Sequence, residues 1–251
     1  MKYTFFGDEE HQKTILPLLK NHEYNEDNPD FVFSLGGDGT ILRAVQAYAN
    51  TNATFIGINM GKLGFYTDFE LSEFSDILNQ IENNSYQEVA FSLLEYHLMG
   101  AHATIRGIGL NELAIISPVH THIIEVDIDG NHFESFRGTG FLISTPTGST
   151  AYNKSCGGSI IDPKIEALQL TEVASINNRI YKTLASPIVF SPETLVQLRS
   201  DFTNTFLSVD GIELKAHDIE QIDVKLASKK VKFITRPHYD FWKRVKKSFL
   251  N

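Results

Sequence analysis

The pattern of apolar and polar positions predicts alternating strands and helices in the first third of the chain and mostly strands after it. Short apolar runs predict strands at three places: Lys2–Phe6, Phe31–Phe33 and Thr54–Ile58. Between these strands, residues 9–20 and 71–81 carry apolar side chains at helical spacing, with Pro17 as an imperfection in the first helix. Strands that alternate with helices predict an α/β domain with a parallel sheet over residues 1–88.

The second part of the chain has short runs of β-branched and aromatic residues at brief intervals. The runs are Leu113–Ile116, Ile123–Ile128, Ile188–Phe190, Leu195–Leu198, Phe206–Val209 and Val231–Ile234. Asp129-Gly130 and Asp210-Gly211 are typical of hairpin turns. We expect a mostly antiparallel, sandwich-like β domain over residues 89–236. Helical patterns interrupt it at Ser149–Ser155 and Ile165–Val173.

The last stretch of the chain, residues 239–250, again places apolar residues at helical intervals and has one basic face. A basic amphipathic helix can bind a membrane or a nucleic acid, but it is more often a solvated helix docked on its own domain. We therefore expect a carboxy-terminal helix, over residues 237–251, that packs back on the α/β domain.

Composition narrows the class of protein. The chain has 251 residues, 42% of them hydrophobic and 21% charged, which is typical of a globular protein. Its formal net charge of −9 argues against a general nucleic-acid binder. The single cysteine, Cys156, excludes an internal disulfide and fits a reducing compartment. The amino terminus lacks the apolar stretch of a signal peptide, and no run approaches a membrane span, so we expect a cytoplasmic protein without a membrane partner.

A glycine-rich turn follows the second predicted strand. Residues 34–40 read Ser-Leu-Gly-Gly-Asp-Gly-Thr and lead into a helical stretch, Ile41–Ala49. Glycine lets the backbone approach a phosphate closely, and the next helix points its N–H groups at the same spot. The predicted phosphate-binding residues are Gly36, Gly37, Gly39 and Thr40. The alternative is an ordinary turn that binds nothing.

The carboxylate of Asp38 lies in the middle of this turn and would repel a phosphate unless it has a task. It could hold Mg²⁺ or take a proton from an attacking hydroxyl. A second glycine-bearing loop, Gly61–Tyr66, follows the next strand, where open α/β sheets bind ligands. Lys62 could offer a cation there and Phe65 a stacking face; the alternative is a surface lysine and a buried phenylalanine.

Three further stretches carry binding chemistry. Asn111-Glu112 places an amide beside a carboxylate, which can accept both hydroxyl protons of a ribose diol. Arg137, in the flexible segment Phe136–Gly140, suits a phosphate. The hydroxyl-rich run from Ser144 to Gly158 enters a helix and offers Tyr152 as an aromatic face for a base.

These stretches, in this order, resemble NAD kinases of the Gram-positive bacterial type. Gly-Gly-Asp-Gly-Thr is also found in lipid kinases and, more loosely, in 6-phosphofructokinases. The lipid kinases lack the run Thr-Pro-Thr-Gly-Ser-Thr-Ala-Tyr, which this chain has at residues 145–152. The resemblance covers about residues 31–210, and the segment 174–179 and the terminal Phe-Trp helix also fit. It implies transfer of the γ-phosphoryl group of ATP to the 2′-hydroxyl of the adenosine ribose of NAD, with Mg²⁺ or Mn²⁺ as the divalent cation, in a homodimer or homotetramer.

The resemblance also implies roles for residues. Asp38 matches the catalytic base, with Gly39 beside it, and Asn111 and Glu112 match the pair that holds the NAD ribose. Arg137 matches a substrate-binding arginine. Further NAD contacts match Thr150, Ala151, Tyr152, Asn153, Lys154, Ser155 and Ala174, and Thr147, Asp210 and Gly211 fall near positions that line the same site. Residues that bind the metal are not identified.

One position departs from the family pattern. The sequence has Thr139 in Arg-Gly-Thr-Gly, where the family usually has an acidic residue near bound NAD. This change puts the strength and selectivity of NAD binding in doubt. Two rival functions stay open at this point: a lipid or sugar kinase that uses the same glycine turn, and a dinucleotide-binding protein without catalysis. Cys156 lies beside the predicted site and fits a small-residue packing position better than a reactive thiol.

Overall fold

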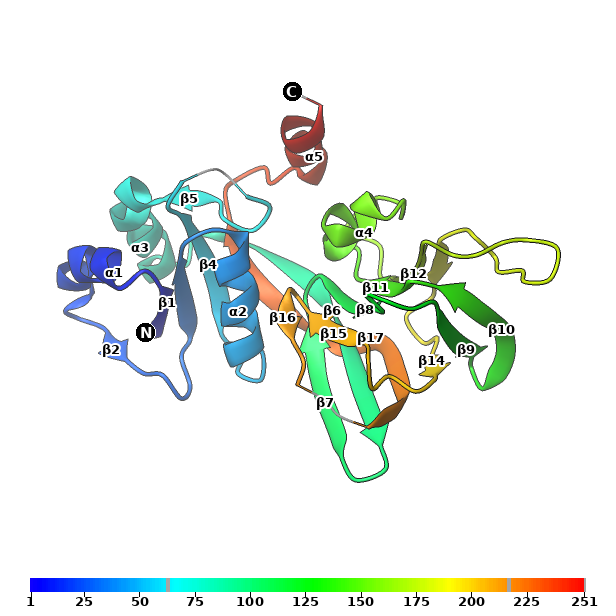
Figure 1. Cartoon of the computed structure of the whole chain (residues 1–251). Helices are drawn as coiled ribbons and strands as arrows, with labels where there is room; N and C mark the ends of the chain where they lie inside the picture. Colours follow the sequence, from blue (N-terminus) through cyan, green and yellow to red (C-terminus); the bar gives the residue numbers. More distant parts are fainter. Residues whose placement is uncertain (62–63, 216–217, 251) are drawn as a thin grey trace. The chain divides into compact units, whose positions relative to one another are not determined.

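The computed structural model describes residues 1–61, 64–215 and 218–250 (Figure 1). The chain divides into two compact units. Unit 1 comprises Met1–Phe91 with Lys230–Asn251, and unit 2 comprises Ser92–Lys229. Two long strands, β6 (Gln87–Gly100) and β17 (Ile219–Thr235), contribute residues to both. Among the helices in these ranges, none is long and apolar enough to cross a membrane.

Unit 1 is built on a parallel sheet, as the alternating pattern predicts. Its strands are β1 (Lys2–Gly7), β2 (Glu23–Tyr24), β3 (Phe31–Leu35), β4 (Thr54–Asn59), β5 (Phe69–Glu70) and the end of β17. The order is β17-β4-β3-β1-β2, with β5 beside β4, and each of these pairs is parallel. Phe33 and Ile56 are fully buried partners in the centre, as expected for parallel strands covered on both faces.

The helices of unit 1 begin in different ways, some at a capping carboxylate or a proline and α2 at Gly37. They are α1 (Glu9–Ile15), the 3₁₀ turn η1 (Leu16–Leu19), α2 (Asp38–Tyr48), the 3₁₀ turn η2 (Leu71–Glu73), α3 (Phe74–Glu82) and α5 (Phe241–Phe249). The carboxylate of Asp8 accepts N–H groups of the first turn of α1, and Asp240 does the same for α5. Pro17 stands at the start of η1, so the predicted first helix tightens there into a 3₁₀ turn.

The carboxy-terminal helix α5 packs on unit 1, which confirms the expectation from its apolar spacing. The rings of Phe241 and Phe249 lie 6.3 and 5.9 Å from the ring of Phe65. Phe241 and Val245 are buried, whereas Trp242 is 51% exposed. Lys243, Lys246 and Lys247 are exposed, so these lysines lie on the solvated side of a docked helix.

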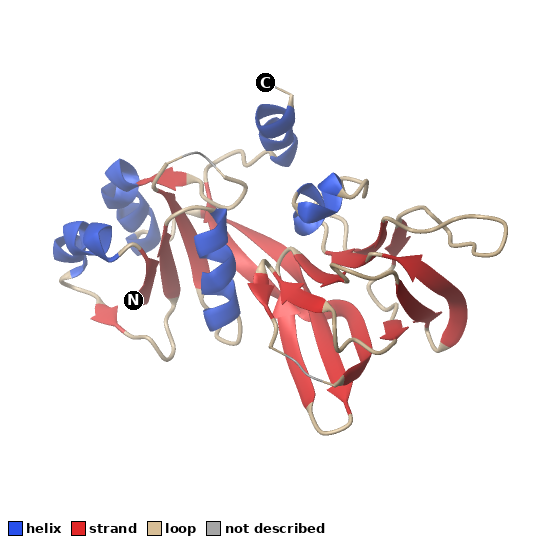
Figure 2. Cartoon of the chain, viewed as in Figure 1, coloured by secondary structure: helices blue, strands red, loops and turns tan. Residues whose placement is uncertain are grey.

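Unit 2 contains two largely antiparallel sheets, and strands predominate in it (Figure 2). One has the order β10-β9-β14-β17, with the hairpin β6–β7, and the other has the order β13-β12-β11-β8-β15-β16. The bounds not yet given are β7 (Thr104–Gly109), β8 (Glu112–Ile116), β9 (His122–Ile128), β10 (Asn131–Gly138), β11 (Gly140–Ser144), β12 (Leu168–Val173), β13 (Ile188–Phe190), β14 (Val196–Arg199), β15 (Phe206–Val209) and β16 (Ile212–Glu213).

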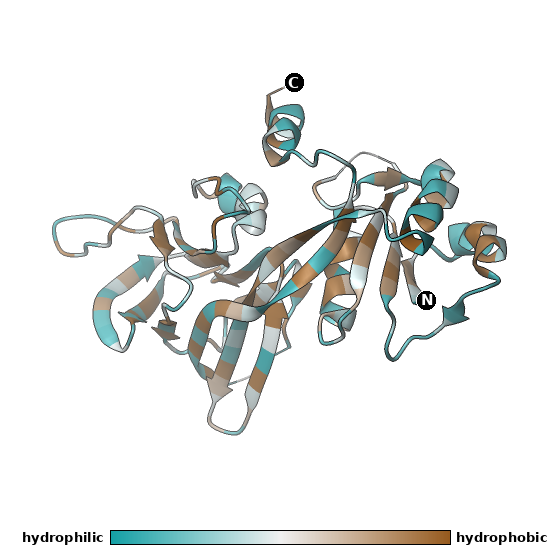
Figure 3. Cartoon of the chain, turned by 180° about the vertical axis from the view of Figure 1, so that it is seen from behind, coloured by the Kyte–Doolittle hydropathy of each residue, from teal (hydrophilic) through white to brown (hydrophobic). Residues whose placement is uncertain are grey.

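Both sheets of unit 2 contribute to one hydrophobic core. Ile124 and Leu198 enter it from the first sheet, and Phe141 and Leu170 enter it from the second. Figure 3 shows the corresponding mixture of hydrophobic and hydrophilic positions along the strands. The sandwich-like architecture predicted from the sequence is therefore confirmed.

One helical prediction is wrong. Residues 165–173 form no helix; β12 occupies the end of this segment and pairs with β11 and β13. Leu168 and Leu170 alternate with the polar residues Gln169 and Thr171, which is the pattern of a strand, and all four are buried. The helical interpretation overlooked this alternation. The other helical pattern is confirmed, since Thr147–Thr150 forms the 3₁₀ turn η3 and Tyr152–Ser155 forms α4.

The strands β1 and β3 approach each other closely at Gly7, the last residue of β1. Gly7 has φ +104°, and a Cβ there would lie 2.2 Å from the carbonyl oxygen of Leu35. Gly130 also has positive φ, +76°, but a Cβ there meets nothing within 4 Å. We expect Gly130→Ala to lower the unfolding free energy by about 1 kcal/mol through backbone strain alone. Gly7→Ala should cost at least ~2 kcal/mol more, because overpacking against backbone is added. Urea unfolding of both variants measures this; equal losses would contradict the close approach of β1 and β3.

Candidate functional site

In unit 1 the glycine turn joins β3 to α2. The N–H of Gly36 donates to the carbonyl of Ile58 at 3.0 Å, which fixes the turn to the end of β4. A Cβ on Gly36, whose φ is +155°, would lie 2.3 Å from Oγ1 of Thr40, so only glycine fits there. Gly37 is the N-cap of α2 and has no side chain to cap it, and Gly37 and Gly39 are exposed. An exposed glycine backbone at a helix amino terminus suits a phosphate group.

The Asp38 side chain is hydrogen-bonded to the second glycine loop. Its Oδ2 accepts the N–H of Phe65 at 2.7 Å, and its Oδ1 accepts the N–H of Tyr66 at 3.0 Å. A Cβ on Gly64 would lie 2.1 Å from Oδ1, so the loop packs directly on the carboxylate. The two glycine loops predicted from the sequence therefore meet at Asp38.

The two residues proposed as additional contacts in this loop have different outcomes. Phe65 packs against Phe241 and Phe249 of α5, so its ring serves the packing of unit 1. Lys62 lies outside the residues that the structure describes.

In unit 2 the carboxylate of Asp210 organises the Asn111-Glu112 segment. Asp210 lies in the β15–β16 hairpin turn with φ +52°, as the Asp-Gly dipeptide predicts. Its Oδ2 accepts the N–H of Leu110 at 2.8 Å, and its Oδ1 accepts those of Asn111 and Glu112 at 2.7 and 3.3 Å. The sequence placed Asp210 only near the site; the structure shows how it fixes the backbone there.

Glu112 is 7% exposed, and its environment favours the neutral acid. Burial, and then the negative charge of Asp210, raise the pKa of Glu112 to about 8. Its Oε2 is buried and has no hydrogen-bond partner within the described residues. Buried carboxyl oxygens are nearly always hydrogen-bonded, so Oε2 of Glu112 can still accept or donate a hydrogen bond.

The hydroxyl-rich turn is attached to the same segment. Oγ1 of Thr145 donates to the carbonyl of Leu110 and accepts the N–H of Gly148 at 3.0 Å. A Cβ on Gly148 would lie 2.0 Å from the carbonyl oxygen of Asn111. The structure thus brings the predicted Asn111-Glu112 pair and the start of the Thr147–Ser155 turn into contact within unit 2.

Side chains of this turn divide into outward and inward groups. Tyr152, Lys154 and Ser155 are exposed. Asn153 is fully buried: its amide donates to the carbonyls of Ser149 and Ser159, and its oxygen accepts the hydroxyl of Thr171 at 2.7 Å. Asn153 therefore holds the turn in shape.

The remaining side chains of the turn lie at different depths. Thr147 and Thr150 are buried, and Ala151 is partly exposed. Burial raises the pKa of Cys156, which keeps its thiol in the less reactive protonated form.

The end of β10 and the segment after β12 bring together Arg137, Thr139 and Ala174. The carbonyl of Arg137 accepts the N–H of Ile176 at 2.7 Å, and the N–H of Thr139 donates to Val173 at 2.9 Å. Ala174 has φ +48°. The guanidinium of Arg137 lies 4.1 Å from the ring centroid of Tyr181, a contact that no sequence motif indicates.

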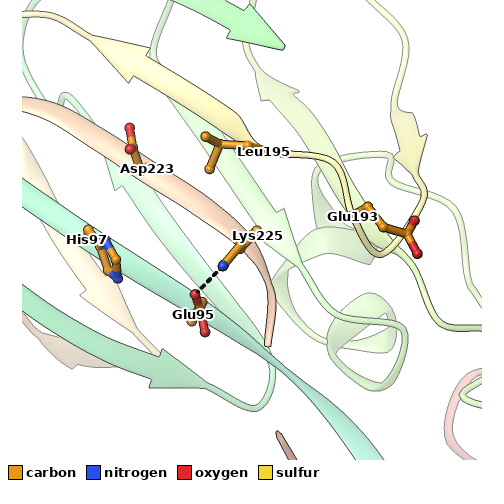
Figure 4. Close-up of a pocket in the computed structure, with 6 residues that line it drawn as sticks. All are labelled: Glu95, His97, Glu193, Leu195, Asp223 and Lys225. Atoms are coloured by element: carbon orange, nitrogen blue, oxygen red, sulfur yellow. Dashed lines mark ion pairs between the residues drawn. The ribbon is translucent and has the colours of Figure 1, made fainter. Parts of the chain in front are cut away.

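Neither a metal-ligand cluster nor the pocket of Figure 4 adds to the candidate site. Within the described residues, no three His, Cys, Asp or Glu side chains form a group that could hold a metal ion. A pocket of about 360 Å³ in unit 2 is lined by Glu95, His97, Glu193, Leu195, Asp223 and Lys225 (Figure 4). It contains none of the motif residues, and Lys225 pairs with Glu95 at 3.0 Å, so we assign it no role.

Comparisons with known proteins agree with the arrangement of motifs. The model of the ATP-NAD kinase N-terminal domain matches residues 8–86, and that of the ATP-NAD kinase C-terminal domain matches residues 110–236. An NAD kinase of Lacticaseibacillus paracasei is 42% identical over 95% of this chain and 92% of its own. NAD kinase 1 of Listeria monocytogenes is 39% identical over 100% of this chain and 99% of its own.

Solved structures give the same result. An NAD kinase from Archaeoglobus fulgidus, in complex with ATP, has a TM-score of 0.75 and 25% identity over 99% of this chain and 96% of its own. A yeast NADH kinase, complexed with NADH, has a TM-score of 0.87 over 100% of this chain and 87% of its own; at 21% identity it shows the fold alone. The two family models together cover most of the chain, and close relatives span nearly all of it, so the chain belongs to the ATP-NAD kinase family.

Proposed function

We propose that this chain transfers the γ-phosphoryl group of ATP to the 2′-hydroxyl of the adenosine ribose of NAD and releases NADP. The observation that carries the proposal is the orphaned, buried Oε2 of Glu112, in a segment that Asp210 fixes. A carboxyl group in this state is suited to pairing with sugar hydroxyls. Membership of the ATP-NAD kinase family supports the identity of that sugar.

Asp38 acts as the general base in this proposal. A ribose hydroxyl is a poor nucleophile near neutral pH, and a positioned carboxylate can take its proton in the transition state. The bonds from Phe65 and Tyr66 fix both oxygens of Asp38, yet each oxygen keeps a second lone pair for a hydroxyl. The amides at the start of α2 face the phosphates of ATP.

Unit 2 holds NAD through four groups of residues. Asn111 and Glu112 hold the ribose diol, and the exposed side chains of Tyr152, Lys154 and Ser155 contact the rest of the dinucleotide. Arg137 supplies a cation for a phosphate, and Thr139 and Ala174 lie beside it. Thr147, Thr150, Ala151, Asn153 and Gly211 shape the walls of the site.

The divalent cation is best treated as part of the ATP substrate. The described residues offer no ready-made cluster of three ligands, although each oxygen of Asp38 keeps a lone pair beside its bond from a backbone N–H group. Mg²⁺ usually keeps several waters and binds through substrate phosphates with one or two carboxylates. When bound, the cation neutralises charge on the β- and γ-phosphates. Mn²⁺ would serve the same purpose.

The cellular setting is also a proposal. We infer a homo-oligomer, dimer or tetramer, formed through the β-rich region over residues 89–236, and a cytoplasmic location, which a single cysteine fits. Size-exclusion chromatography with light scattering would test the oligomer, and a monomer at micromolar concentration would contradict it.

One assay separates the three candidate functions. The purified chain is incubated with NAD, ATP and Mg²⁺, and NADP is detected with an NADP-specific dehydrogenase while ADP is measured independently. NADP and ADP in equal amounts are expected. ADP formed only with a lipid or sugar acceptor would favour those kinases, and NAD binding without either product would indicate a protein without catalysis.

Asp38→Asn should lower kcat by about 10²-fold or more, because an amide cannot act as the base. The structure adds a cost in stability: one amide oxygen can replace only one carboxylate oxygen, so about 1–3 kcal/mol of unfolding free energy should be lost. Asp8→Asn is the control for the loss of a helix-start carboxylate: Asp8 accepts two backbone N–H groups, both on Oδ1, which an amide oxygen can replace. It should keep kcat. A near-normal kcat in Asp38→Asn would show that Asp38 only shapes the loop.

The pKa of Glu112 predicts a pH-dependent stability. Because the folded pKa of about 8 lies above the ordinary value of 4.5, the folded chain keeps a proton that the unfolded chain releases between these values. The unfolding free energy therefore falls as pH rises through this window, by up to ~1.4 kcal/mol per pH unit. Glutamine does not titrate, so the unfolding free energy of Glu112→Gln should not show this fall. The difference between the variant and wild type, measured by urea unfolding, should therefore grow steadily in favour of the variant from pH 5 to pH 8. A difference that stays constant with pH would contradict a neutral, buried Glu112.

Thr139→Asp should lower the KM for NAD a few-fold with little change in kcat, because the family's acidic residue adds a charged hydrogen bond remote from the transferred phosphoryl group. A charged bond exceeds a neutral one by roughly 1 kcal/mol, or about 5-fold. Thr139→Asn is the control without the charge and should match wild type. Steady-state kinetics measure both; a KM that rises in Thr139→Asp would mean that the neighbouring residues leave the new carboxylate unpaired.

A further inference from the structure

Two consecutive peptide groups in unit 1 lie between Asp38 and an arginine of α5. The first links Gly64 to Phe65: its N–H donates to Oδ2 of Asp38 at 2.7 Å, and its carbonyl accepts Nη1 of Arg244 at 3.3 Å. The second links Phe65 to Tyr66: its N–H donates to Oδ1 of Asp38 at 3.0 Å, and its carbonyl accepts the same Nη1 at 2.6 Å. Each peptide group therefore connects the guanidinium to one carboxylate oxygen.

Arg244 is itself held in place. Its Nη2 forms an ion pair with Asp68, whose side chain is 5% exposed, and its guanidinium lies 4.8 Å from the ring centroid of Tyr239. The Arg244 side chain is 13% exposed. Burial lowers the pKa of Arg244 to about 10, and the negative charge of Asp38 opposes this shift, as expected for opposite charges at short range. The helix α5 thus delivers one buried cation to the back of the loop that Asp38 contacts.

A hydrogen bond to a peptide carbonyl polarises that peptide and strengthens its N–H as a donor. Arg244 is well suited to this, because its planar fork carries several fixed donors and stays charged. With the carbonyls of Gly64 and Phe65 bound to Arg244, the N–H groups of Phe65 and Tyr66 point at Asp38. The orientation of the Asp38 carboxylate then depends on a residue more than 200 positions away in the sequence.

We propose that Arg244 is a positioning residue for the reaction, which holds Asp38 in its working orientation through the peptide groups of Gly64–Tyr66. The proposal rests on the proposed function, in which Asp38 is the base. Arg244 contacts peptide carbonyls and Asp68, so it acts through Asp38 and not on the substrate.

The test is a double-mutant cycle with Arg244→Met and Asp38→Asn in the full chain. Arg244→Met should lower kcat for NADP formation at least ~10-fold while the KM for NAD changes less than ~2-fold, because a group that orients the base affects the chemical step. In the Asp38→Asn background, Arg244→Met should lower the remaining kcat by less than ~2-fold, since coupled residues are not additive. Arg244→Lys keeps the charge beside Asp68 but lacks the fork, so it should fold and still lose kcat several-fold.

Arg236→Met is the matched control. Arg236 donates from Nε to the carbonyl of Asp68 at 2.7 Å and from Nη2 to Glu73 at 2.5 Å, so its loss removes an ion pair, more exposed than that of Arg244, from unit 1. It should lower the melting temperature but leave kcat within ~2-fold. Hydrogen exchange gives a readout without activity: the amides of Phe65 and Tyr66 should exchange faster in Arg244→Met and not in Arg236→Met.

Failure of the two proposals gives different results. If wild type makes no NADP, the proposed function fails, and unchanged exchange at Phe65 and Tyr66 in Arg244→Met would then overturn the positioning role as well. If wild type is active, a normal kcat in Arg244→Lys overturns the inference. So does a loss in Arg244→Met that multiplies fully with that of Asp38→Asn.

Discussion

In both units the candidate chemistry depends on hydrogen bonds that backbone N–H groups donate to a carboxylate. Asp38 accepts from two successive amides of the second glycine loop, and Asp210 accepts from three around Asn111. Asp210 is buried and Asp38 is partly buried. A charge removed from water needs hydrogen bonds, so each carboxylate favours one conformation of the backbone that donates to it. In unit 1 these hydrogen bonds orient the side chain of Asp38, the proposed base. In unit 2 the hydrogen bonds to Asp210 hold the backbone of Glu112, the proposed ribose-binding residue.

The arrangement in unit 2 carries a cost that a ligand can offset. Asp210 and the surrounding burial disfavour a charge on Glu112, and one Glu112 oxygen is left without a partner in the described structure. Stability would be greater with an apolar residue there. Sites that are built for binding often retain such unfavourable groups, because the substrate supplies the missing hydrogen bonds. Asn153, by contrast, is fully paired inside its turn and holds it rigid.

Much of this could be predicted from the sequence because the signals are local. The parallel sheet of unit 1, the turn at Asp38 and the hairpin at Asp210 follow from apolar periodicity and glycine chemistry. Other features depend on contacts between distant residues. The role of Arg244 depends on the docking of α5. The helix expected over Ile165–Val173 was wrong for another reason: the alternation of Leu168 and Leu170 with polar residues, typical of a strand, was given too little weight. Neither the partner of the Asp38 carboxylate nor the inward turn of Asn153 has a signal in the sequence.

The central claim is that the adenosine ribose of NAD receives the phosphoryl group. The most direct measurement is ³¹P nuclear magnetic resonance of the product formed from NAD, ATP and Mg²⁺ by the purified chain. The account predicts one new phosphomonoester, on the 2′-oxygen of the adenosine ribose, in amounts equal to the ADP formed. A phosphate on another hydroxyl of NAD, or ADP formed while NAD stays unchanged, would contradict it.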